Sequence, residues 1–225
     1  MTIDVEPFSD LGLAASRGAH RPAAGSNIIL IGASGAGKTK VGFLLAKLLG
    51  YGFLDLDQII EGNARATTEV IFASHGEEHF RRLETAAITA LRGLRSHVIA
   101  TGGGAVLAEG NWDQLARLGT IVWLSTPADE IARRLIGSEA EMAKRPLLAE
   151  VLSVADPEAR LRLLTERISA LIGNRLEFYR QADLVVADSF STPESTAQRV
   201  RFALQQASVL SPSIEQQPYD RWHVL

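Results

Sequence analysis

An eight-residue segment at residues 32–39, with the sequence GASGAGKT, constrains the fold more than any other part of the chain. It has the spacing G-x-x-x-x-G-K-[ST] and lies directly between an apolar run and a helical pattern. Glycines at these positions let backbone N–H groups converge on phosphate oxygens, and the start of a helix adds a positive partial charge. The segment therefore predicts a phosphate-binding loop between a strand and a helix. The alternative is a glycine-rich turn that binds nothing.

Two residues of this loop carry specific chemistry in the prediction. Lys38 is placed to reach the β- and γ-phosphates of a nucleotide, and the hydroxyl of Thr39 can ligate Mg²⁺. A nucleophile elbow around Ser34 is excluded because position 36 is alanine. A dinucleotide-binding fingerprint starting at Gly35 is excluded because position 40 is lysine.

Short apolar runs alternate with helical patterns through the rest of the chain. This rhythm predicts an α/β fold, a three-layer α/β/α sandwich in which a five-stranded parallel sheet lies between helices. The predicted strands are residues 27–31, 52–56, 97–101, 120–124 and 183–186.

Several helix boundaries can be predicted from local signals. Leucines recur on one face after Lys38, and Gly50 is placed to end that helix. A further helix is predicted to begin near Gly76, and a long one after Pro157 is predicted to bend at Gly173. Three helix starts are predicted from an N-cap residue followed by proline: Thr126-Pro127, Asp156-Pro157 and Thr192-Pro193.

The composition excludes several classes of partner. The 225 residues carry a net charge of -3 and no cysteine, which gives no basic footprint for nucleic acid and rules out disulfides and thiolate metal sites. No apolar run is long enough to span a bilayer, and acidic residues interrupt the N-terminal segment where a signal peptide would be apolar. We therefore expect a cytoplasmic protein with no nucleic-acid partner and no membrane partner.

The periodic part of the sequence defines one domain. It predicts a flexible extension at residues 1–26, a globular domain at 27–206 and a tail at 207–225. Residues 137–150 mix basic, acidic and proline residues without a clear period, which is typical of a mobile flap. Arg145 in this flap would bring positive charge over the phosphates on closure, although the residue taken alone is ordinary surface.

The second strand is predicted to end in two acids, Asp55 and Asp57, whose side chains project to the same side at the edge where α/β proteins bind ligands. Asp55 could hold Mg²⁺ through its water shell, and Asp57 could accept a hydrogen bond or proton from an attacking hydroxyl. The alternative is that these acids cap the following helix.

Other candidates for the acceptor site are less specific. Arg81 and Glu84 share a helix face at i, i+3 and are expected to pair, which would hold the arginine as a carboxylate fork or leave it on a solvated face. Three glycines, Gly102 to Gly104, follow the third strand, where they would let the backbone approach a ligand and adopt positive φ, or form an ordinary tight turn. Arg175 and Tyr179 lie four residues apart, with no intrinsic mark of a ligand site.

Six motifs follow one another along residues 27–206: GASGAGKT, DLD, FRRLE, the triple glycine, RPLL and RxxxYRQAD. In this order they resemble the shikimate kinase family. The resemblance implies a nucleoside-monophosphate-kinase-like fold and phosphorylation of the shikimate 3-hydroxyl by ATP with Mg²⁺, in aromatic amino-acid (chorismate) biosynthesis. It implies ATP and shikimate as partners, and we expect a monomer.

The resemblance also implies roles for individual residues. The implied ATP contacts are Gly35, Ala36, Gly37, Lys38, Thr39, Lys40, Arg134 and Arg145. The implied shikimate contacts are Asp57, Arg81, Gly103 and Arg175, within acceptor-binding helices at about residues 57–93. Thr39 and Asp55 would serve Mg²⁺, residues 137–150 would form the lid, and the catalytic residues would be Lys38, Asp57 and Arg145.

Some positions depart from the family pattern. Ser34 stands where methionine is usual, Lys40 where a small hydroxyl residue is common, and Glu177 where proline is often found. Two other functions therefore stay open, a related sugar-acid kinase such as gluconate kinase and a ligand-sensing domain without turnover. The DLD and triple-glycine elements argue against the first, and retention of both acids with Lys38 and Arg145 argues against the second.

Overall fold

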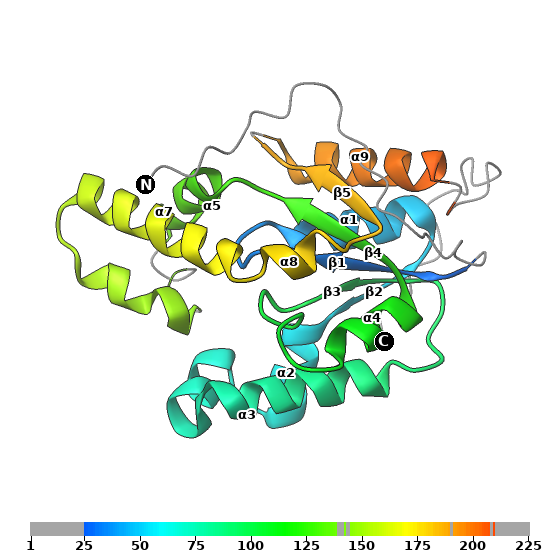
Figure 1. The fold of residues 1–225 in the computed structure, drawn as a ribbon, viewed down its shortest axis with the longest axis horizontal. Coiled ribbons are helices and arrows are strands. Elements are labelled where there is room, and N and C mark those ends of the chain that lie inside the picture. The colour runs from blue at the N-terminus through cyan, green and yellow to red at the C-terminus, as the bar shows by residue number, and fades with distance from the viewer. Residues whose placement is uncertain (1–24, 139–141, 143–144, 190, 208, 210–225) are drawn as a thin grey trace.

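The computed structural model describes residues 25–138, 142, 145–189, 191–207 and 209. They contain a five-stranded parallel sheet with the strand order β2-β3-β1-β4-β5. The strands are β1 (Asn27–Ile31), β2 (Gly52–Asp55), β3 (His97–Ala100), β4 (Gly119–Ser125) and β5 (Leu184–Ala187). Helices cover both faces of this sheet, so the predicted three-layer α/β fold is confirmed (Figure 1).

The central strand β1 has the sequence NIILI, and all five of its residues are buried. A strand covered on both faces is expected to be continuously apolar, as this one nearly is. The chain leaves β1 for β2 on one side and later crosses to β4 on the other side, so the strand order reverses at β1. Ligands of open α/β sheets bind at this reversal, beyond the carboxyl ends of the strands.

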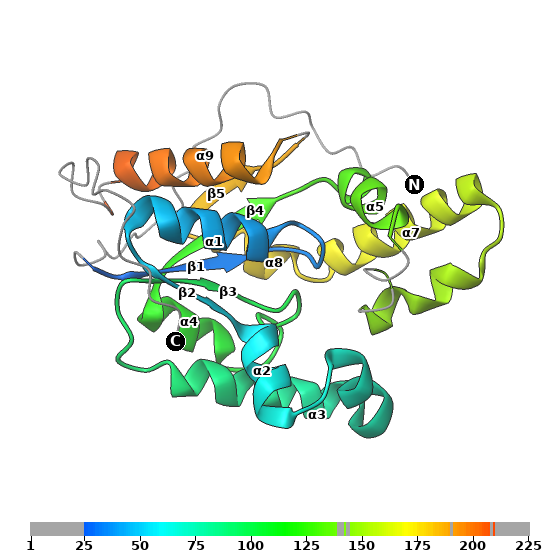
Figure 2. The same ribbon diagram turned by 180° about the vertical axis from the view of Figure 1, so that it is seen from behind.

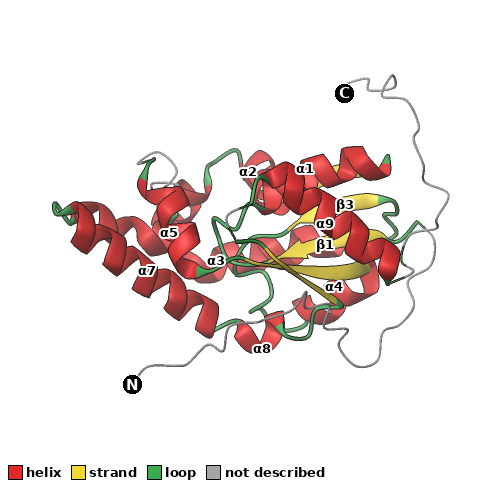
Figure 3. Cartoon of the chain, turned by 90° about the horizontal axis from the view of Figure 1, so that it is seen from above, coloured by secondary structure: helices red, strands yellow, loops and turns green. Residues whose placement is uncertain are grey.

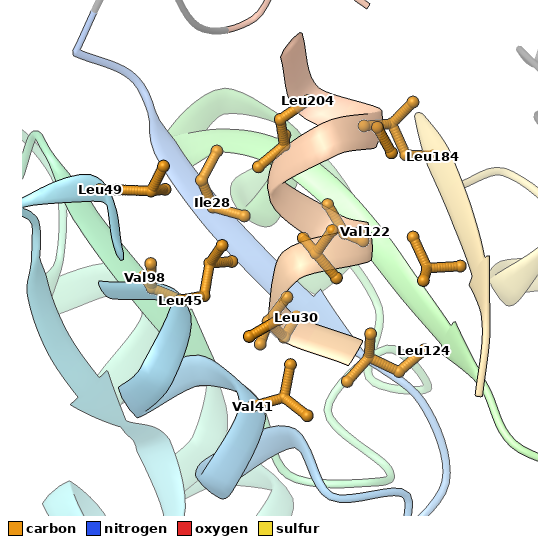
Figure 4. Close-up of a cluster of buried hydrophobic side chains, with 14 of the residues drawn as sticks. Ile28, Leu30, Val41, Leu45, Leu49, Val98, Val122, Leu124, Leu184 and Leu204 are labelled. Carbon is orange, nitrogen blue, oxygen red and sulfur yellow. The ribbon is translucent and has the colours of Figure 1, made fainter. Parts of the chain in front are cut away.

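Two helices cover one face of the sheet. They are α1 (Lys38–Leu49) and α9 (Pro193–Gln206), and they pack on the strands through a cluster that includes Ile28, Leu45 and Leu204 (Figures 2 and 4). The other face carries α3 (Thr68–Ala90), α4 (Asn111–Leu118) and α8 (Leu176–Tyr179), with α2 (Leu56–Ala64) joining β2 to α3.

A third group of elements extends beyond the sheet (Figures 1 and 3). It contains α5 (Ala128–Ile136), η1 (Pro146–Ser153) and α7 (Pro157–Gly173). Its apolar side chains pack on Ala33 and Ala36 of the glycine-rich loop, so this group is built directly onto the loop. The flap predicted at residues 137–150 falls partly outside the described residues, and its last part forms the start of η1 rather than irregular chain.

The structure differs from the sequence-based expectations about local structure at several points. β2 ends at Asp55, so Asp57 lies in the first turn of α2 instead of on the strand. Helix α3 has a kink at Gly76, whose φ of 80° and ψ of 173° are not helical, so a helical segment begins beside Gly76 as predicted, and it follows an earlier segment that begins at Thr68. The long helix α7 ends at Gly173 instead of bending there. Helix α4 was not predicted at all.

The predicted N-caps behave differently from one another. Asp156 accepts a hydrogen bond from the N–H of Ala159 at 2.7 Å, and Thr192 accepts one from the N–H of Ser195 at 3.2 Å, as expected for caps. Thr126 caps nothing, because α5 starts two residues later and the Thr126 side chain turns toward the glycine-rich loop.

The predicted N-terminal extension and C-terminal tail lie outside the described residues, apart from Gly25, Ser26, Ala207 and Val209. The carbonyl of Gly25 accepts the N–H of Ser96 at 2.8 Å, and Val209 packs into the cluster beneath α9. None of the helices in the described part of the chain has the length and apolarity needed to cross a bilayer.

Candidate active site

The glycine-rich loop joins β1 to α1 at the switch in strand order. Gly35 and Gly37 have φ values of 87° and 92°, in the left-handed region that favours glycine. The Lys38 ammonium donates hydrogen bonds to the carbonyls of Gly32 at 2.9 Å and Ala33 at 2.8 Å. Burial lowers the pKa of Lys38 to about 8, against the opposing effect of two nearby acids. The loop therefore presents a desolvated cation at the position where phosphates are expected.

Both carboxylate oxygens of Asp55 accept hydrogen bonds, one from the glycine-rich loop and two from the start of α2. Its Oδ2 accepts a hydrogen bond from the Thr39 hydroxyl at 2.6 Å, and its Oδ1 accepts the N–H groups of Asp57 at 3.0 Å and Gln58 at 3.4 Å. Asp55 is thus the N-cap of α2, as the alternative interpretation expected, and it also touches the loop threonine.

The oxygen pair formed by Thr39 and Asp55 suits Mg²⁺, which prefers hydroxyl, carboxylate and phosphate oxygens. In the described residues, no group of three or more His, Cys, Asp or Glu side chains is arranged to hold a metal. A metal at this position would therefore need phosphate oxygens and water to complete its coordination, which is how Mg²⁺ binds with nucleotides.

Asp57 lies beside Asp55 in a cavity of about 510 Å³. Burial raises the pKa of Asp57 to about 6, with a further increase from Asp55 and a partial decrease from Lys38. A carboxylate with a pKa near 6 is a stronger base than an exposed aspartate and is still ionised at neutral pH. Asp57 is therefore suited to accept a proton or a hydrogen bond.

Arg81 forms the predicted ion pair with Glu84 at 2.5 Å and a second one with Glu77 at 2.6 Å. The Glu84 side chain is fully buried, and burial outweighs the neighbouring guanidinium to raise its pKa to about 7. Its other oxygen, Oε1, is buried with no hydrogen-bond partner among the described residues. Two acids hold Arg81 at the cavity wall, so it does not belong to a solvated face.

The three glycines are required because other side chains pack closely against them, and not because of their backbone conformation. None of Gly102, Gly103 and Gly104 has positive φ, contrary to the prediction. A Cβ on Gly102 would clash with Glu84 and lie 2.8 Å from Asp57 Oδ1, and one on Gly104 would lie 2.5 Å from the Arg81 guanidinium. The absent side chains leave room for the acids and the arginine that line the cavity.

This steric requirement gives a testable prediction. Gly104→Ala should leave the fold intact, because the atoms it meets are the end of the flexible Arg81 side chain. The displaced guanidinium should raise the KM of the acceptor about tenfold, since small misplacements of a positioning group are costly. Steady-state kinetics with each substrate varied in turn would measure this.

The control for this prediction is Gly62→Ala, in the exposed interior of α2, where a new Cβ meets nothing within 4 Å. It should leave both KM values unchanged. A Gly104→Ala enzyme with an unchanged acceptor KM would contradict the proposed role of this wall.

Tyr179, at the end of α8, and Arg175, the N-cap of that helix, approach the same turn. The Arg175 side chain is buried, and a Cβ on Gly103 would lie 3.4 Å from its Nη1. The Tyr179 hydroxyl donates to the Gly103 carbonyl at 3.1 Å, and its ring stacks on Trp123 at 5.4 Å between centroids. Tyr179 thus fixes the glycine turn, a role that its spacing from Arg175 did not reveal.

The structure brings most predicted residues to this one cavity. Those that line it are Thr39, Lys40, Asp55, Asp57, Arg81, Gly103, Arg145 and Arg175. Arg145 and Arg175 are both close enough to Lys38 to lower its pKa. Arg134 lies elsewhere, on α5, with Nη1 3.9 Å from the position of a Cβ on Gly37.

Comparisons of the sequence with known proteins point to one family. The family model that describes shikimate kinase matches residues 34–205. A shikimate kinase from Nostoc punctiforme is 43% identical over 177 residues, which is 78% of this chain and 89% of the relative. One from Caldanaerobacter subterraneus is 41% identical over 174 residues, 77% of this chain and 93% of the relative.

Solved structures give the same result. The shikimate kinase of Acinetobacter baumannii, in complex with shikimate, matches with a TM-score of 0.69 and 34% identity, over 80% of this chain and 93% of that one. The enzyme of Bacteroides thetaiotaomicron matches with a TM-score of 0.68 and 30% identity, over 80% and 98%. The family match, the relatives and the fold lead to one conclusion: the chain is an ATP-dependent kinase that belongs to the shikimate kinase family.

Proposed function

We propose that the chain transfers the γ-phosphoryl group of ATP to the 3-hydroxyl of shikimate, giving shikimate 3-phosphate and ADP for aromatic amino-acid (chorismate) biosynthesis. One observation carries the proposal. A single cavity is lined by the carboxylate of Asp57 and by two arginines suited to a carboxylate, Arg81 and Arg175. The loop cation Lys38 lies close enough to Asp57 and Arg175 for their charges to change its pKa. These groups match a phosphate donor, a hydroxyl acceptor and the carboxylate of that acceptor.

The ATP end of the site is the glycine-rich loop. We infer phosphate contacts from the backbone of Gly35, Ala36 and Gly37, together with the side chains of Lys38, Thr39, Lys40 and Arg145, and a contact nearer the base from Arg134. Mg²⁺ would be held by Thr39, Asp55 and the phosphates, and it would supply charge neutralisation when bound.

The acceptor end uses charges of both signs. Arg81 and Arg175 would form hydrogen-bonded ion pairs with the carboxylate of shikimate, since planar guanidinium groups suit such a fork. The Gly103 backbone would contact the ring. Asp57 would then orient the 3-hydroxyl toward the γ-phosphate and accept its proton as the new P–O bond forms.

Catalysis in this site would consist mainly of alignment and electrostatics. Lys38 and Arg145 would neutralise charge on the transferring group, because a fixed cation in a desolvated site costs no reorganisation during the reaction. Residues 137–150 would close over the phosphates and exclude water. We propose that the protein acts as a monomer in the cytoplasm.

The direct test mixes purified protein and MgATP with shikimate, with gluconate or with no acceptor, and follows ADP release. We expect turnover that depends on shikimate. Turnover with gluconate alone would keep the kinase and overturn the acceptor. Shikimate binding without any turnover would favour a sensing domain instead.

The pH dependence of the reaction tests the role of Asp57 as a proton acceptor. Only its ionised form can accept a proton, so kcat/KM for shikimate should fall about tenfold per unit as the pH drops below its pKa of about 6. Rates from pH 5 to pH 8 at saturating MgATP would show this. Because the pKa of Glu84 is about 7, the Glu84→Gln variant should be measured alongside, and it should keep the acid limb near pH 6. If the fall in kcat/KM at acid pH disappears in this variant, the group whose protonation causes it is Glu84 and not Asp57.

A further inference from the structure

A buried carboxylate outside the cavity is not used by the proposed reaction. Asp188 follows β5 directly, is only 2% exposed and donates its backbone N–H to the Ser125 carbonyl at 3.0 Å. Four side chains surround its two oxygens: Arg134 at 2.9 Å and Thr126 at 3.4 Å from Oδ2, and Thr196 at 2.5 Å and Arg199 at 3.4 Å from Oδ1. Asp188 thus joins α5 and the end of β4 to α9.

Two of these partners reach the glycine-rich loop. The Arg134 Nη1 lies 3.9 Å from the position of a Cβ on Gly37, and the Thr126 hydroxyl is 3.5 Å from the Ala36 carbonyl. Only one side chain, Arg134 or Thr126, therefore lies between Asp188 and the loop at each of these two places.

The position of this acid needs an explanation. A carboxylate near a site for a polyanionic nucleotide repels the ligand, and burying it is unfavourable unless it is paired. It is not needed as the cap of α9, because Thr192 fills that role. Besides its contacts with Thr196 and Arg199 of α9, Asp188 provides an ion pair with Arg134 of α5, which joins two separate elements.

Arg134 is held from two directions. Glu130, one turn earlier on α5, accepts from its Nε at 3.1 Å, and Asp188 accepts from its Nη1. The third nitrogen, Nη2, is buried without a hydrogen-bond partner among the described residues. A buried donor left without a partner is costly, and an acceptor on a ligand would satisfy it.

We propose that Asp188 is a positioning residue for the nucleotide: through its ion pair it holds the Arg134 guanidinium beside the glycine-rich loop, in the orientation that contacts ATP. The inference rests on the proposed function, which places Arg134 at the nucleotide. It predicts that the charge of Asp188 favours ATP binding through orientation, although the same charge alone would oppose it.

The test is Asp188→Asn, which keeps the shape and an acceptor for Thr196 but removes the charge. We expect the Kd for MgATP, measured by calorimetry, to rise about tenfold, the loss expected for one charge-assisted hydrogen bond. The KM for ATP should rise equally, while kcat and the KM for shikimate stay within about twofold. An electrostatic effect alone would lower the Kd, so a lower or unchanged Kd overturns the proposal.

The matched control is Asp183→Asn, immediately before β5 at the other end of the strand, where the carboxylate accepts the N–H of Ile121 at 2.8 Å. It should leave the Kd for ATP unchanged. If it raises this Kd as much as Asp188→Asn, the effect is structural and the proposal fails.

A double variant separates positioning from an independent effect. If Asp188 acts through Arg134, the variant carrying both Asp188→Asn and Arg134→Gln should bind ATP no more weakly than Arg134→Gln alone. If the increase in Kd for the double variant were the product of the increases for the two single variants, Asp188 would act independently of Arg134 and the proposal would be contradicted. Should Asp188→Asn not fold, Asp188→Glu retains the charge but displaces it, and its Kd should still exceed that of the natural protein. An Arg134→Gln or Asp188→Glu protein with unchanged ATP affinity overturns the inference.

The proposed function can fail separately. If the natural protein bound no MgATP, both the proposed kinase reaction and this inference would be wrong. If the natural protein binds MgATP and the folded variants bind it equally well, only the role of Asp188 is lost.

Discussion

Lys38→Ala should reduce kcat about 10³-fold, the scale seen when a preorganised charge is removed from a transferring group. The ammonium sits on the Gly32 and Ala33 carbonyls in a desolvated site, which holds it in place before ATP arrives. Its pKa of about 8 leaves it mostly protonated at neutral pH, and bound phosphates would raise that pKa further. ADP release at saturating MgATP and shikimate measures the loss.

The control for this prediction is Lys47→Ala on the same helix. Lys47 is exposed and lies over the ring of Phe43, with Nζ 4.5 Å from the ring centroid, so it carries the same charge without facing the loop. Its removal should leave kcat within about twofold, as surface substitutions usually have small effects. A Lys38→Ala protein that kept a tenth of the natural kcat would contradict the role assigned to Lys38.

The fold was largely predictable because its signals are local. Buried parallel strands are short apolar runs, and the helix that follows the glycine-rich loop is closed by Gly50, which has φ 66°. The misses came where local signals were absent or had two meanings. Helix α4 is only eight residues long, so the recurrence of its apolar residues Trp112, Leu115 and Leu118 spans too short a stretch to identify a helix. The Thr126-Pro127 pair resembled a cap, although Thr126 bonds to the loop instead.

The site was predictable as a set of positions, but its packing was not. A motif gives the spacing of Lys38 and Thr39, whereas the reason for the triple glycine lies in side chains from α2 and α3 that press against it. Those contacts join residues far apart in sequence, so no periodicity reveals them.

Asp188 and Tyr179 were also not predictable from local sequence patterns. The sequence marks neither as a site residue, because each acts through a contact with another segment: Asp188 with Arg134, and Tyr179 with Gly103. The sequence signal that exists is positional, since Asp188 directly follows a strand at the edge where ligands bind. Asp188 shares this position with Asp55, which also lies at the carboxyl end of a strand.

Asp57→Asn should reduce kcat by about 10²-fold or more, the usual contribution of a positioned general base, without changing the affinity for MgATP. Amide replacement preserves the shape of the side chain, so shikimate should still bind between the arginines. What is lost is the ionised oxygen, whose raised pKa of about 6 reflects burial beside Asp55. Single-turnover rates and the Kd for MgATP would separate chemistry from binding.

Asp113→Asn is the matched control, because Asp113 is the first-turn acid of α4 as Asp57 is of α2, and it is exposed. It removes the same charge from a helix N-terminus, where an acid interacts favourably with the dipole, yet it lies outside the cavity lining. Its kcat should match that of the natural protein. If Asp57→Asn instead raised only the KM for shikimate and left kcat unaltered, Asp57 would bind the acceptor without taking part in the chemistry, and the transfer would depend on alignment and the cations alone.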